Sequence, residues 1–177
     1  WYKSYEYGEG TCYAQSRDGL KWEKPLFDIF PIDGEPTNIV YRGFDPELVL
    51  QGQFNCSVGA IMNVPDDPDP QRRYRLFSYQ APMTAEARKE YPNSKGLYVA
   101  HSPDGVHWCP RRQPVLTGAD APELSDANSC MHDSLKDRFI AFPKRHIVRS
   151  DGTGDQGVTQ RVTTIAFSDD FEHWTKP

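Results

Sequence analysis

One seven-residue phrase occurs three times in this chain, and it constrains the fold more than any other feature. In residues 16–22, 102–108 and 168–174, Ser and Trp stand six positions apart and Asp follows the Ser by two. A short run of small, β-branched or aromatic residues precedes each copy, and Pro follows within three residues. Asp and Gly tolerate tight turns, and Trp is a large apolar anchor for a returning strand. Each copy therefore predicts a β-hairpin.

The distance between copies predicts the size of the repeated unit. From Ser16 to Ser102 is 86 residues and from Ser102 to Ser168 is 66, which is room for four strands with their loops. Strands are expected at 55–62, 73–79, 96–101 and 106–109, and again at 125–131, 138–142, 159–167 and 172–175. Only residues 83–91 resemble a helix. Radial repetition of four-stranded units is the plan of a β-propeller.

The sequence thus predicts an all-β fold, a β-propeller in a single domain. We expect a partial blade in residues 1–27 and whole blades in 54–110 and 124–177, about two and a half in all. Propellers use four to eight blades to close a ring. The chain is therefore expected to be a fragment, or to close by self-association.

Composition narrows the classes of partner. The formal net charge is −5 without a Lys/Arg block, which argues against nucleic acid. No stretch approaches 18 apolar residues, so no membrane span is expected. The cysteines, Cys12, Cys56, Cys109 and Cys130, form no CxxC pair, so a zinc site is not expected. Two disulfides and four buried thiols both remain possible.

Several longer phrases resemble a known group of proteins. They are NIVYRG (38–43), DPDPQRRYRLF (67–77), GLYVAHSPDGVHW (96–108) and TIAFSDDFEHWTKP (164–177). The chain resembles bacterial five-bladed β-propeller proteins related to glycoside hydrolase families 32, 43 and 68. The resemblance implies a carbohydrate-active enzyme, secreted or periplasmic, whose catalytic carboxylates lie on innermost strands of different blades. The nucleophile and acid motifs of family 32 are absent, so part of the site is expected on blades outside this chain.

Asp126 is the candidate catalytic carboxylate. We expect it at the start of an axis-lining strand, with Asn128 on the same face two residues later as a substrate ligand. Glycoside hydrolysis uses two carboxyl groups, one of which has a raised pKa and donates a proton. The alternative is a capping or turn role for Asp126.

Other candidate substrate ligands lie near the same predicted funnel. Asp45 and Glu47 stand on a loop leading to an inner strand, or else in a solvated turn with Pro46. Arg145, joined by Arg161 on the adjacent strand, is expected to hold a sugar hydroxyl or a uronic carboxylate, or to be a solvated strand end. Tyr41 is expected to offer a ring for sugar stacking.

The repeat assigns further residues to structure. Asp18, Asp104 and Asp170 are interpreted as turn formers, similar to the Asp boxes of sialidases. Lys21, His107 and His173 share one surface position, and the three Trp residues are expected to pack between strands. No cofactor is expected beyond a structural calcium at Asp151 and Asp155.

The resulting hypothesis is a glycoside hydrolase that cleaves an oligo- or polysaccharide with carboxylate chemistry at the propeller funnel. Its expected partner is the carbohydrate substrate. The alternative is a non-catalytic β-propeller that binds carbohydrate or protein through the same funnel.

Overall fold

The computed structural model describes residues 1–4, 9–120, 123–149 and 158–177 and confirms the all-β prediction. Within these residues the helices are short: α1 (Pro46–Leu50), α2 (Ala85–Glu90) and a 3₁₀ turn (Pro70–Arg72). α2 confirms the helix expected within 83–91, whereas α1 was not expected. None of the helices in the described ranges has the length and hydropathy that crossing a bilayer requires.

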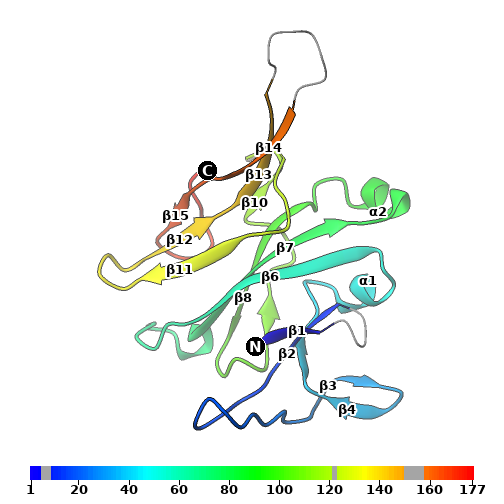
Figure 1. Ribbon diagram of the computed structural model, residues 1–177, viewed down its shortest axis with the longest axis vertical. Coiled ribbons are helices and arrows are strands. Elements are labelled where there is room, and N and C mark those ends of the chain that lie inside the picture. The colour runs from blue at the N-terminus through cyan, green and yellow to red at the C-terminus, as the bar shows by residue number, and fades with distance from the viewer. Residues whose placement is uncertain (5–8, 121–122, 150–157) are drawn as a thin grey trace.

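The middle sheet is an antiparallel meander at the centre of Figure 1. It consists of β6 (Phe54–Asn63), β7 (Tyr74–Pro82), β8 (Gly96–Ser102), β9 (Cys109–Pro110) and β10 (Leu116–Thr117). β9 and β10 both pair with β8, at opposite ends of that strand. A bulge between Val58 and Ala60 interrupts the β6–β7 register. The strands expected at 55–62, 73–79 and 96–101 are confirmed. The strand expected at 106–109 was wrong, because β9 begins only at Cys109 and residues 103–108 form the turn.

The first sheet precedes the middle sheet and is smaller. It has the order β1 (Tyr2–Ser4), β2 (Gly10–Cys12) and β5 (Ile39–Tyr41). Between β2 and β5 the chain makes a separate hairpin of β3 (Phe27–Ile32) and β4 (Glu35–Thr37). The Gln15–Glu23 bridge closes the first copy of the repeated turn.

The third sheet follows the middle sheet and departs from the expected strands. It has the order β11 (Ser129–Asp133), β12 (Arg138–Phe142) and β15 (Ala166–Ser168). β13 (Lys144–Arg149) and β14 (Val158–Thr163) form a separate two-stranded ladder, which projects from one end of the molecule in Figure 1.

The strand expected over 159–167 is therefore divided into β14 and β15. Pro143 stands between β12 and β13 and has no N–H to donate, so the ladder is interrupted there. The Pro143 carbonyl instead accepts hydrogen bonds from the backbone N and the hydroxyl of Thr164. No regular strand forms over 172–175, although the Thr175 backbone N donates to the Phe167 carbonyl. The expectation of a strand over 172–175 was wrong.

The three repeated turns have the same hydrogen bonds. In each turn the Ser hydroxyl contacts the Asp carboxylate at 3.0–3.1 Å, and one oxygen of that Asp accepts two backbone amides at 2.8 Å. The residue after the Asp has a positive φ, and it is Gly19, Gly105 and Phe171 in turn. These contacts confirm Asp18, Asp104 and Asp170 as turn formers.

Two apolar clusters lie between the sheets. One cluster joins the middle sheet to the third, through residues that include Phe77, Phe139 and Phe171. The other joins the first sheet to the middle one, through residues that include Tyr41, Phe54 and Tyr98. Each sheet is thus held to its neighbour in the chain by a core of its own.

Candidate active site around Asp126

Asp126 precedes the third sheet and does not lie within its first strand. β11 begins at Ser129, so the expectation that this strand starts at residue 125 was wrong. The preceding segment pairs with β13 instead. The Ser125 backbone N donates to the Lys144 carbonyl at 3.1 Å, and the His146 backbone N donates to the Glu123 carbonyl at 3.0 Å.

The Asp126 carboxylate is exposed and forms an ion pair with Lys144. The Asp126 side chain is 61% exposed, whereas that of Lys144 is only 16% exposed. The hydrogen bond from the Lys144 ammonium, helped by one from the Ser125 hydroxyl, lowers the pKa of Asp126 to about 2. Asp126 is therefore ionised at neutral pH, and it cannot serve as the proton donor.

Tyr79 of the middle sheet lies within electrostatic range of Asp126. Burial raises the pKa of Tyr79 to about 12, and the negative charge of Asp126 adds to the rise. The phenol is thus neutral. Asp126 therefore stands where the third sheet approaches β7.

The register of β13 and β14 separates Arg145 from Arg161, the two arginines that were expected to act together. Arg161 lies directly opposite His146, and Arg145 lies directly opposite Val162. Directly opposite residues share a face, and neighbours along a strand alternate between faces. Arg161 and His146 thus share the face of Lys144, which points toward Asp126, and Arg145 lies on the other face. Arg161 therefore lies opposite His146, the neighbour of Arg145, and not on the face of Arg145 itself.

Asn128 is 8% exposed and has its amide group engaged within the protein. Its Nδ2 donates to the Ser125 carbonyl at 2.7 Å, and its Oδ1 accepts from the Lys144 backbone N at 3.0 Å. Its own carbonyl lies against Gly59, where any Cβ would collide with it. Asn128 therefore fixes the loop that carries Asp126 and brings β11 against β6.

The candidates in the first half of the chain lie in structural positions. Tyr41 is 2% exposed, and its hydroxyl accepts from Gln80 at 3.3 Å, so its ring has no free face for a sugar. Asp45 caps α1 by accepting from the backbone N of Glu47 and Leu48. Glu47 is exposed in the first turn of that helix. These three residues are not joined to Asp126.

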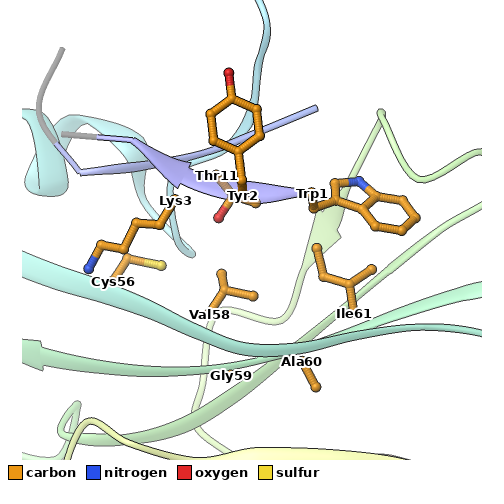
Figure 2. A pocket seen from close by; sticks show the side chains of 9 residues that line it. All are labelled: Trp1, Tyr2, Lys3, Thr11, Cys56, Val58, Gly59, Ala60 and Ile61. Atoms are coloured by element: carbon orange, nitrogen blue, oxygen red, sulfur yellow. The ribbon is translucent and has the colours of Figure 1, made fainter. Parts of the chain in front are cut away.

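A cavity of about 280 Å³ lies between the first sheet and β6 (Figure 2). Val58 and Ile61 point from β6 toward β1, and Ala60 points away, as the bulge requires (Figure 2). Trp1 forms one wall, where its indole N–H donates to the Gly105 carbonyl at 2.7 Å. Burial raises the pKa of the Cys56 thiol in this cavity to about 12, so that thiol is not a nucleophile.

The sequence left the state of the cysteines open between disulfides and free thiols. The four thiols are free, and Cys109 is the exposed one. Over the described ranges, no group of His, Cys, Asp and Glu converges as a metal site would require. Asp151 and Asp155, the expected calcium ligands, lie outside the described residues.

Sequence reasoning missed Lys144 and Tyr79 as neighbours of Asp126. Lys144 directly follows Pro143, which ends β12, and that position was the available signal. Glu123 has a φ of 64°, a left-handed conformation that is uncommon for a non-glycine residue. Comparisons with protein-family models, curated proteins and solved structures found no match to this chain.

Proposed function

We propose that this chain is part of a β-propeller glycoside hydrolase in which Asp126 is the ionised carboxylate. The observation that supports this proposal is the exposed Asp126 side chain, which Lys144 holds near the point where β11 lies against β6. The repeated sheets and turns support the propeller, and the resemblance of the longer phrases supports the reaction.

The lowered pKa of Asp126 supports its role as the ionised carboxylate in the proposed reaction. One carboxyl group must protonate the leaving oxygen, and the other must be ionised as nucleophile or base. Asp126 fits the ionised member. His146 and Arg161, on the same face as Lys144, supply donors to sugar hydroxyls or to a uronic carboxylate. Glu123, three residues away and exposed, is the nearest carboxyl along the chain for the proton donor.

The test measures reducing-sugar release on a panel of polysaccharides and aryl glycosides. Asp126→Asn should lower kcat by at least about a hundredfold while substrate binding is kept. Asp28→Asn changes an exposed carboxylate on β3 and should leave activity unchanged. Activity that survives Asp126→Asn would overturn the assignment.

The Lys144→Met variant gives a second test of Asp126 in the same activity assay. Without the ammonium, the pKa of Asp126 should rise toward its ordinary value, because the lowering contact is gone. The acidic limb of the kcat/KM profile should then move to higher pH. An unmoved limb would show that Asp126 is not the group that must be ionised.

Carbohydrate binding without hydrolysis is the second candidate. The observation that favours it is that every described carboxyl group with a clearly shifted pKa has it lowered, namely Asp18, Asp104, Asp126 and Asp170. Ionised carboxylates accept hydrogen bonds from sugar hydroxyls but give no proton. Glycan binding that Asp126→Asn weakens, with no product on any substrate, would favour this role.

A further inference from the structure

A groove of about 600 Å³ lies at one end of the middle sheet, beside the starts of β8 and β10. Residues 91–94, between α2 and β8, form one side of it, and residues 112–114, between β9 and β10, form another. The buried rings of Phe44 and Tyr98, stacked on one another at 5.1 Å, also line it. Its volume lies within the range of about 300–1,000 Å³ that ligand sites usually have. Every lining residue lies between positions 44 and 117, so the middle of the chain builds this groove by itself.

Hydrogen bonds fix the 91–94 side of the groove. The Ser94 hydroxyl donates to the Tyr91 carbonyl at 2.7 Å, and the Tyr98 hydroxyl donates to the Ser94 carbonyl at 2.6 Å. The Tyr91 ring packs edge-on against Phe54 at 5.6 Å and is only half-buried, so part of it stays open to the groove. A side that is fixed before a ligand arrives costs less entropy when the ligand binds.

The 112–114 side combines a fixed backbone with polar side chains that are free to bind. A backbone hydrogen bond to β8 holds the chain directly before this connection, and another holds it directly after. Arg112 and Gln113 are exposed, and in the part of the chain that the structure describes neither side chain has a hydrogen bond or an ion pair. The same is true of Asn93 on the other side. Two amides and one guanidinium are thus available to a ligand.

This combination of groups matches the chemistry of a sugar. A sugar ring has C–H groups on its faces, which pack on aromatic rings, and hydroxyls at its edge, which pair with amides. Arg112 is the single charged residue among the described ones that line the groove, and it suits either a hydroxyl or a uronic carboxylate. An apolar base with a few polar groups around it is typical of sites that orient a small ligand.

We propose that this groove is a second carbohydrate site, which holds a segment of a polysaccharide away from Asp126. Among the described residues, none that lines the groove also contacts Asp126. A polymer can therefore occupy both places at once, and the second contact raises the effective concentration of the chain at the first. The choice of a polysaccharide rests on the proposed action on carbohydrate.

The test is affinity electrophoresis of the purified chain in gels that contain each polysaccharide of the activity panel. At least one polymer should retard the wild type. Arg112→Ala and Gln113→Ala should each weaken the affinity for that polymer by at least about threefold, since each removes a hydrogen-bonding group. Arg17→Ala and Gln71→Ala make the same changes at exposed positions outside the groove and should not alter the retardation. Far-UV circular dichroism checks that each variant folds.

Retardation does not require hydrolysis, so this result can be read whether or not the proposed reaction occurs. Retardation that the groove variants lose, with no product from any substrate, would support the second site and count against the hydrolase. Retardation that the Arg112→Ala/Gln113→Ala double variant keeps in full would overturn the second site, and so would the absence of retardation by every polymer. If the chain is also a hydrolase, groove variants should have a raised KM on the polymer and an unchanged kcat/KM on short aryl glycosides, which cannot reach both places.

Discussion

The first turn (residues 16–22) and the third turn (residues 168–174) have the same local hydrogen bonds and opposite surroundings. In both, the Asp carboxylate accepts two backbone amides at 2.8 Å, and the Trp indole donates to the carbonyl three residues back. Yet Trp22 is 61% exposed, whereas Trp174 packs against Phe77 at 5.4 Å. The comparison teaches that local bonds within the seven residues suffice for the shape of the turn, and that neighbouring sheets determine how much it contributes to stability.

The largest expected difference between the turns concerns Phe171. Phe171→Ala should lower the free energy of unfolding by about 3–5 kcal/mol, because it empties a buried site between Phe77 and Phe139. Leu20→Ala in the first turn should change it by less than about 0.5 kcal/mol. Urea denaturation followed by circular dichroism measures both. Equal losses would contradict the burial argument.

The matched tryptophans give the next largest effect. Trp174→Ala should cost about 2–3 kcal/mol of unfolding free energy, since the ring contacts Phe77 and Phe171. Trp22→Ala should cost under about 0.5 kcal/mol. Thermal denaturation of the two variants tests this pair. A large loss from Trp22→Ala would show that the first turn is already covered.

The conformation of Phe171 gives a smaller effect. The residue occupies a position that Gly holds in the other two turns, with a φ of 71°. Because a left-handed backbone disfavours a side chain by about 1 kcal/mol, Phe171→Gly should be about 1 kcal/mol more stable than Phe171→Ala. Chemical denaturation of the two variants side by side measures the difference. An alanine variant as stable as the glycine variant would exclude backbone strain there.

Acid should produce the smallest difference. Burial works to raise the pKa of Asp170, but hydrogen bonds from His173 and backbone amides outweigh it, so the pKa is lowered. Its stabilising contribution is then complete above the unfolded pKa of about 3.9 and is lost progressively as pH falls from there through the lowered folded pKa. The difference in melting temperature between wild type and Asp170→Asn should therefore begin to shrink only below about pH 4 and should vanish in stronger acid. A difference that persists in acid would implicate packing.

The strands of the middle sheet could be predicted from the sequence, because alternating side chains and turn residues mark them. The third sheet could be predicted less well, because the break between β14 and β15 lies at Thr164, which bonds to Pro143 in the break between β12 and β13. The residues of 159–167 alone do not mark that break. Asp126 was singled out, but its partner Lys144 was not, because their pairing depends on the 123–125 segment lying along β13.

The remaining candidate ligands, in the first half of the chain, occupy structural positions that the sequence did not reveal. Tyr41 has an aromatic ring of the kind that stacks on sugars. The residues next to it in the sequence do not reveal that Trp108 packs edge-on against it. Asp45 and Pro46 predict a turn equally well as a helix start, and α1 is only five residues long. A long-range contact decides the position of Tyr41, whereas local capping of α1 decides that of Asp45.

The local bonding of the turns has a consequence for the order in which the chain folds. Every hydrogen bond between the Ser, the Asp and the amides of a turn spans at most three residues. Contacts between close neighbours in sequence form on the microsecond scale or faster, well ahead of distant strand pairing. Each turn can therefore close before its sheet assembles. The three turns, once formed, then limit which strands can pair next.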